Sequence, residues 1–236
     1  MDTQVFFDQL EACIRRYDLL THPFYQAWSR GELSREDLCR YARDYYHHVD
    51  SFPRYLAEFA RRLPSTELRQ AVLTNLAEEI GGNGRPSHSE LWMDFAKGVG
   101  ARSPFLGDTP SAAIRTLITF FHRVAKTGTP AQALAAFYVY ESQVPRVAQE
   151  KLRGLREYYG ANESACRYFL VHTTEDVRHA RVWKEQLEVV VGSSPTGAEA
   201  ALKTAEATAA LLWAALPGPA CQSPECFVPN NLLAMM

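Results

Sequence analysis

Cysteine is scarce in this sequence, and the few copies are not spaced as a disulfide framework. The 236-residue chain has five cysteines, an odd number, scattered between Cys13 and Cys226. Small secreted domains that depend on disulfides carry far more cysteines for their length. Cys221 and Cys226 have neither histidine partners nor a second close cysteine pair, which argues against a structural zinc site there. A reducing, cytoplasmic location is therefore the default expectation.

The chain also lacks long apolar runs and an excess of positive charge. No run approaches 18 apolar residues, which argues against a membrane span. The first residues show no basic segment followed by an apolar one, so no secretory signal is expected. Lys and Arg number 25 against 27 Asp and Glu, a formal charge of −2. The composition therefore lacks the excess of basic residues that is typical of proteins that bind nucleic acid. We expect neither a nucleic-acid partner nor a membrane.

Strand patterns are nearly absent, whereas helical periodicity recurs along the chain. One helix is expected to open at residues 21–24 and another to follow the turn at residues 31–37. The last residues, 216–236, carry several prolines and no helical period, so we expect a mobile tail there. The sequence predicts an all-α bundle, with a single domain over residues 1–215. The other predicted helices cover residues 3–17, 66–80, 88–98, 110–127, 130–159 (kinked at Pro145), 163–191 and 196–215.

The stretch HTTEDVRHA, which starts at His172, concentrates candidate metal ligands on a predicted helix. At about 100° per residue, His172, Asp176 and His179 share a stripe roughly 60° wide. Trp183 lies near the same stripe, so this face should point inward, where unpartnered polar groups are costly. Imidazole and carboxylate together suit iron, manganese or zinc. Glu175, at the edge of the stripe, is an alternative to Asp176, and a solvated surface helix is the alternative to a metal site.

Two further places add carboxylates and an imidazole to this set. Glu141 directly follows eight apolar residues, 133–140, so its carboxylate should be buried and either paired or a ligand. Glu78 and Glu79 end one predicted helix, and His88 begins the next after a glycine-rich break. Three carboxylates and three imidazoles from four predicted helices suit two metal ions with positions left open for dioxygen. The predicted ligands are Glu79, His88, Glu141, His172, Asp176 and His179.

Several stretches together resemble the haem-oxygenase-like diiron oxidase superfamily and, within it, the family of the Chlamydia protein associating with death domains. The resemblance implies a seven-helix haem-oxygenase-like bundle in which the same six residues bind a pair of metals. The loop between Glu79 and His88 is two residues longer than in the Chlamydia protein, which keeps Glu78 as an alternative to Glu79. The matching stretches are HPFYQAWSRGEL (22–33), YARDYYHHVDSFPRYL (41–56), NLAEE and HSELW (within 75–92), YESQVPRVAQEKLRGL (140–155) and EDVRHAR (175–181).

The same resemblance implies oxygen-dependent formation of para-aminobenzoate for folate synthesis, in which the protein consumes part of itself. Tyr25 would supply the aromatic ring, Lys151 the amino group, and Tyr41 would relay an electron or radical. The implied cofactors are two metal ions, iron–iron or iron–manganese, with dioxygen as co-substrate and an external reductant. A homodimer is expected by fold analogy.

Other readings of the same fold stay open at this point. A thiaminase-type hydrolase needs a pocket cysteine, and residues 133–145 contain none. A cofactor-free oxidase of the type that completes pyrroloquinoline quinone has no need for the six ligands. A death-domain interaction protein also leaves them unexplained. Without the resemblance, Tyr25 would be read as core packing and Lys151 as a solvated helix residue.

Overall fold

The computed structural model describes residues 2–64, 66–82, 84–102, 107–193 and 195–218, and these residues confirm the all-α prediction. Helices account for about four fifths of them, and no strand occurs among them. Within these ranges, no helix combines the length and apolar character that a membrane crossing needs. The predicted tail, 216–236, lies from residue 219 onward outside the described residues.

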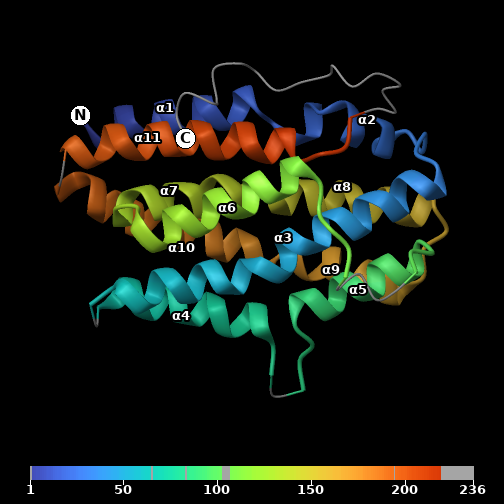
Figure 1. The fold of residues 1–236 in the computed structure, drawn as a ribbon. Coiled ribbons are helices and arrows are strands. Elements are labelled where there is room, and N and C mark those ends of the chain that lie inside the picture. Colours follow the sequence, from blue (N-terminus) through green and yellow to red (C-terminus); the bar gives the residue numbers. More distant parts are fainter. Residues whose placement is uncertain (1, 65, 83, 103–106, 194, 219–236) are drawn as a thin grey trace.

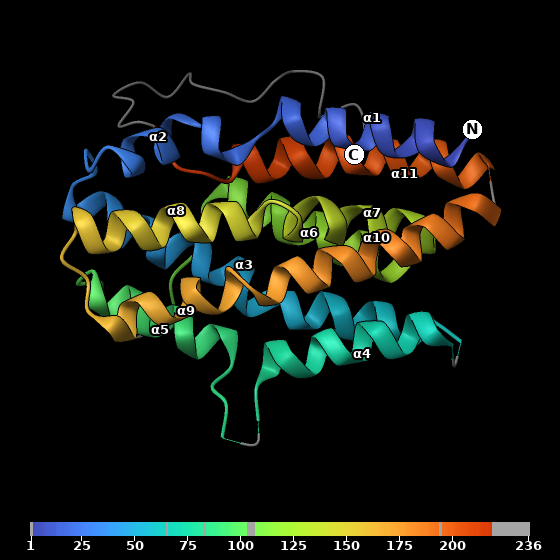
Figure 2. The same cartoon turned by 180° about the vertical axis from the view of Figure 1, so that it is seen from behind.

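The helices stack in layers around a central one (Figures 1 and 2). The outer layer of α1 and α11 covers one side of α7, while α10 packs against another side. Beyond them α3 contacts α4, α5 and α6, and α5 pairs with α9. The elements are α1 (Thr3–Arg16), η1 (Leu19–Thr21), α2 (Pro23–Ser29), α3 (Arg35–Arg62), α4 (Glu67–Ile80), α5 (His88–Gly98), α6 (Ala112–Thr127), α7 (Pro130–Glu141), α8 (Val144–Glu157), α9 (Glu163–His172), α10 (Glu175–Ser193) and α11 (Pro195–Ala214).

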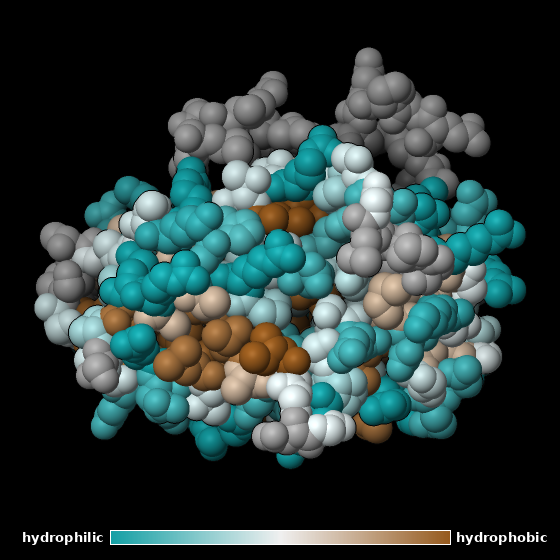
Figure 3. Space-filling model, turned by 60° about the horizontal axis from the view of Figure 1, so that its bottom comes forward, coloured by the Kyte–Doolittle hydropathy of each residue, from teal (hydrophilic) through white to brown (hydrophobic). Residues whose placement is uncertain are grey.

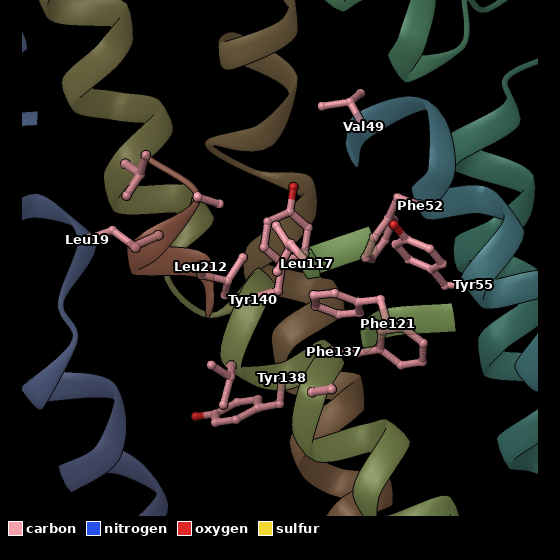
Figure 4. Packing of buried hydrophobic residues seen from close by; sticks show 14 of the residues in the cluster. Leu19, Val49, Phe52, Tyr55, Leu117, Phe121, Phe137, Tyr138, Tyr140 and Leu212 are labelled. Atoms are coloured by element: carbon pink, nitrogen blue, oxygen red, sulfur yellow. The ribbon is translucent and has the colours of Figure 1, made fainter. Parts of the chain in front are cut away.

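Helix α7 forms the centre of the core because its sequence is apolar on every side. From Ala133 to Glu141 each residue is buried, as expected for a helix without a polar face. Phe137 and Tyr140 pack against Phe52 of α3, with ring centroids 6.0 and 5.1 Å apart (Figure 4). The apolar run therefore carries the carboxylate at its end into the interior of the bundle.

The segment 130–159, predicted as one kinked helix, consists of two helices. Helix α7 ends at Glu141 and α8 begins at Val144. Pro145 has no N–H, and its ring clashes with the carbonyl four residues earlier, so a helix cannot run through unchanged. The buried side chain of Gln143 supports the break, since its amide donates to the Val139 carbonyl and its oxygen accepts from the Leu19 N–H.

The segment 163–191 is also two helices, so the prediction of a single continuous stripe was wrong. Helix α9 ends at His172 and α10 begins at Glu175. The hydroxyls of Thr173 and Thr174 donate to the carbonyls of Leu170 and Val171. Such local bonds compete with helical ones, and paired β-branched residues lower helix propensity. His172 therefore closes one helix, whereas Asp176 and His179 open the next.

Candidate metal centre

The six predicted ligands lie together in the interior, in two groups of three. All six residues are at most 5% exposed. Within each group, one potential ligand atom per residue lies within 4.8 Å of those of the other two. They come from five helices rather than the four expected, because one helix ends at His172 and the next begins at Glu175. The first group is Glu79 (α4), His88 (α5) and His172 (α9), and the second is Glu141 (α7), Asp176 and His179 (α10).

In the first group, the two imidazoles present free nitrogens near the carboxylate. Nδ1 of His172 lies 2.6 Å from the Tyr168 carbonyl oxygen, so it donates there and Nε2 keeps its lone pair. Nδ1 of His88 lies 2.8 Å from Oε2 of Glu79, yet it makes no hydrogen bond among the described residues. A ring nitrogen and a carboxylate oxygen that form an ion pair at this distance, without the geometry of a hydrogen bond, also fit two ligands of a shared cation.

In the second group, the carboxylates are held by neighbours and one oxygen is left unpartnered. Nδ1 of His179 lies 3.1 Å from Oδ1 of Asp176 and 3.8 Å from Oε2 of Glu141. Trp183 donates to Glu141 at 2.5 Å, and Asn75 donates to it at 3.3 Å. Oδ2 of Asp176, fully buried, makes no hydrogen bond within the described ranges. This orphaned oxygen also fits a metal ligand.

Burial and mutual repulsion set the charges of these groups. Burial raises the pKa of Glu141 to about 8 and lowers that of His172 to about 4. Burial also opposes charge on His88 and His179, but the surrounding carboxylates outweigh it, raising the pKa of His88 to about 10 and that of His179 to about 9. Protons on His88, His179 and Glu141 thus offset the negative charge of the other carboxylates, and two divalent cations would take the place of these protons.

The structure separates the carboxylates between which the sequence left a choice. Glu79 and Asp176 belong to the two groups, whereas Glu78 and Glu175 lie just outside them. Glu78 bonds Nε2 of His179 at 2.6 Å, and Glu175, about one-third exposed, approaches Nε2 of His88 to 3.6 Å. Both glutamates line a surface groove of about 700 Å³. The groove is lined by residues of α4, α5, α9 and α10 and of the loop between α4 and α5. Figure 3 shows one face of the molecule, on which hydrophilic side chains surround smaller hydrophobic areas.

A small cavity connects the two groups and is closed on its other side by the core. Glu79 and His172 of the first group line it together with Glu141 and Asp176 of the second. Apolar and aromatic side chains complete its wall. They are Val49, Phe52, Tyr140 and Tyr168.

The three predicted reactive residues form a second cluster. Lys151 is 4% exposed, and its amine donates to the hydroxyl of Tyr41. The hydroxyls of Tyr25 and Tyr41 lie 3.3 Å apart. Burial lowers the pKa of Lys151 well below its ordinary value and raises the pKa of both tyrosines well above theirs. Lys151 is therefore not a solvated lysine, and burial favours its neutral amine.

Aromatic rings enclose this amine on several sides. Six ring centroids lie between 4.6 and 5.9 Å from Nζ of Lys151, and among the described residues it makes no ion pair with a carboxylate. An ammonium would gain some attraction from these rings, but a carboxylate or water would stabilise it far more. The rings belong to Tyr25, Trp28, Tyr41, Tyr45, Trp92 and Phe169.

Aromatic contacts connect the lysine cluster to the first group of ligands. The ring of Trp92 lies 5.7 Å from that of Tyr41 and 4.8 Å from that of Tyr168. Tyr168 in turn stacks on His172 at 4.1 Å. Sequence reasoning missed both connecting residues, although a signal was present. Trp92 and Tyr168 each lie four residues from a histidine predicted as a ligand, on the same helix face.

Comparison with known proteins places the chain among redox enzymes of this fold. Relatives named 4-aminobenzoate synthase include one from Chlamydia muridarum, 43% identical over 78% of each chain, and one from Nitrosomonas europaea, 32% identical over 92% of each. The crystal structure of a TenA homologue from Pseudomonas syringae superposes with a TM-score of 0.77 over 90% of each chain at 15% identity, which confirms the haem-oxygenase-like fold. A family model described as iron-containing redox enzyme matches residues 39–213. The chain belongs to this family of iron-containing redox enzymes.

Proposed function

We propose that this protein forms para-aminobenzoate in an oxygen-dependent reaction that consumes its own side chains. Tyr25 is the source of the ring and Lys151 the source of the amino group. The observation that carries the proposal is the burial of the Lys151 amine against Tyr25 and Tyr41, without a carboxylate to hold it charged in the described part of the chain. The names of the relatives and the two groups of buried ligands support the same reaction.

Each part of the proposed site has a physical task. The six ligands hold two ions, iron–iron or iron–manganese, which when bound supply the activation of dioxygen. Tyr41 lies between the amine and the Tyr25 hydroxyl, so it can pass a proton, or an electron with its proton, from one to the other. The neutral amine keeps the lone pair that a new carbon–nitrogen bond needs. The surrounding rings keep water away from both reacting side chains.

The other functions considered for this fold receive less support. A hydrolase of the thiaminase type needs a cysteine nucleophile, and no cysteine lines the cavity between the two ligand groups. A cofactor-free oxidase or a death-domain binding protein would leave six buried ligands without a purpose. The proposal further includes an external reductant, a cytoplasmic location and assembly as a homodimer.

Isotope labelling tests the proposal directly. Protein made with ring-¹³C tyrosine and ¹⁵N-lysine, loaded with ferrous and manganous ions, should release doubly labelled para-aminobenzoate on exposure to oxygen and reductant. The yield should not exceed one product per chain, since each chain has one Tyr25. Mass spectrometry of the small-molecule fraction is the measurement.

Free labelled amino acids added to unlabelled protein are the control, and they should leave the product unlabelled. Product that carries label from the free amino acids, or several products per chain, would show that the ring and nitrogen come from a dissociable substrate instead.

A further inference from the structure

His179 is held from outside the proposed metal site by a glutamate that is not itself in either ligand group. Nδ1 of His179 faces the second group, 3.1 Å from Asp176 and 3.8 Å from Glu141. Nε2, on the opposite edge of the ring, lies 2.6 Å from Oε2 of Glu78. Because an ionised carboxylate only accepts hydrogen bonds, Nε2 carries the proton of this bond. Nδ1 also faces carboxylates, so a cation held by Asp176 and Glu141 would replace the proton on Nδ1 while Nε2 goes on donating to Glu78.

Glu78 is itself fixed in place on the rim of the surface groove. Its side chain is 23% exposed, and Arg178 pairs with the same oxygen at 2.5 Å. Arg178 adjoins His179 in α10, so the glutamate from α4 joins two consecutive residues of the other helix. This arrangement restricts both the position of the carboxylate and the rotation of the imidazole.

The position of Glu78 in α4 is unfavourable for the helix alone. Glu78 and Glu79 occupy the last turn, which has no basic residue, and negative charge near a helix C-terminus opposes the helix dipole. Successive residues point about 100° apart, so one helix end supplies Glu79 to the first group and Glu78 to the histidine of the second. A local cost of this kind is typical of functional sites.

The other two imidazoles are held differently. Nδ1 of His172 bonds a backbone carbonyl, and Nε2 of His88 is 3.6 Å from Glu175, which is longer than a hydrogen bond. Of the three imidazoles in the two ligand groups, that of His179 is the one whose outer nitrogen is held at hydrogen-bond distance by a carboxylate. Its orientation can therefore be changed by a side-chain substitution that touches no ligand.

We infer that Glu78 is a positioning residue, which fixes the tautomer and orientation of His179 so that Nδ1 binds one metal ion of the pair. The inference rests on the proposed function, because it takes His179 as a ligand. Carboxylates that accept from a metal-bound histidine raise the basicity of the imidazole, and their loss lowers metal affinity about 10- to 100-fold.

The test is an anaerobic titration of metal-free protein with Co²⁺, followed by visible absorption, for the wild type and for Glu78→Ala, Glu78→Gln and His179→Ala. Wild type should bind two equivalents. In Glu78→Ala one of the two binding steps should weaken about 10- to 100-fold, with a changed absorption spectrum, while the other step is unchanged. His179→Ala should abolish that same step. Glu78→Gln should lose only a few-fold, because its amide oxygen still accepts from Nε2.

Controls separate orientation from a general loss of structure. Glu185→Ala, in a mostly exposed glutamate of α10, should bind both ions as wild type does. The melting temperature of metal-free Glu78→Ala, measured by circular dichroism, should stay close to that of Glu78→Gln. Two full-strength steps in Glu78→Ala, or equal losses in Ala and Gln, overturn the inference and leave the proposed function standing. A wild type that binds no metal overturns both.

Discussion

Replacing Tyr25 with phenylalanine should abolish para-aminobenzoate formation while both metal ions stay bound. The substitution removes one hydroxyl from a 3%-exposed side chain, and that hydroxyl contacts Tyr41 at 3.3 Å. A phenyl ring is far harder to oxidise than a phenol. Without the hydroxyl, the ring at position 25 should not be oxidised, and no para-aminobenzoate should form. The six ligands belong to other helices, so the metal content should remain about two ions per chain. Single-turnover product assays and elemental analysis of the same preparation measure both quantities.

The matched control for this substitution is Tyr55→Phe. Tyr55 is as deeply buried as Tyr25, and its hydroxyl makes no hydrogen bond within the described ranges. The control should therefore keep both the product yield and the metal content of wild type. Product from Tyr25→Phe at more than a few per cent of wild type would exclude Tyr25 as the ring donor, whatever the metal content.

Replacing His172 with alanine should remove at least one of the two metal ions and with it all product. His172 is 4% exposed and lies in the first ligand group with Glu79 and His88. Its loss leaves one carboxylate and one imidazole there, too few for a tightly held ion. The metal content of protein purified from iron- and manganese-supplemented cells should fall from about two equivalents per chain to one or none. Inductively coupled plasma mass spectrometry is the measurement.

His122→Ala is the matched control for this experiment. His122 also pairs with a glutamate, Glu58, but it does so at the partly exposed surface of α6, away from both groups. Its replacement should leave two equivalents bound. Full metal content in His172→Ala would contradict the ligand assignment, and a similar loss in both variants would indicate reduced folding rather than a missing ligand.

The sequence allowed the fold class and most of the helices to be predicted, because apolar periodicity reports directly which faces are buried. The clearest success is Glu141. Eight apolar residues before it predicted a buried helix, and α7 is buried on all sides with this carboxylate at its end. Burial of one acid in such a run follows from physical chemistry without any knowledge of relatives.

The stripe of three ligands shows where periodicity fails. His172, Asp176 and His179 do converge on the interior, but on two helices rather than on one face of a single helix. The break depends on hydroxyl–carbonyl bonds of two threonines, which a count of apolar positions does not register. The break between the helices also has a role, since it directs His172 to the first ligand group and Asp176 and His179 to the second.

Contacts between distant parts of the chain could not be derived from local pattern. Glu78 and Glu79 are adjacent residues of the same type, and only the packing of α4 against α5 and α10 distinguishes them. Lys151 and Tyr25 are separated by more than half of the chain, and each alone is an unremarkable residue of a helix. The resemblance suggested that they meet, whereas their burial among six rings emerged only from the fold.

The enclosure around Tyr25 has a consequence for the fate of the protein after the proposed reaction. The ring packs against Phe24 and beneath the Lys151 amine, in a helix only seven residues long that rests on α8 and η1. Excision of a buried aromatic side chain costs about 3–5 kcal/mol, a large part of the 5–15 kcal/mol that stabilises a typical domain. After the reaction the chain would be less stable at the wall of the site that confines the product. Release of the product and destabilisation of the protein would then follow from the same loss of the Tyr25 side chain.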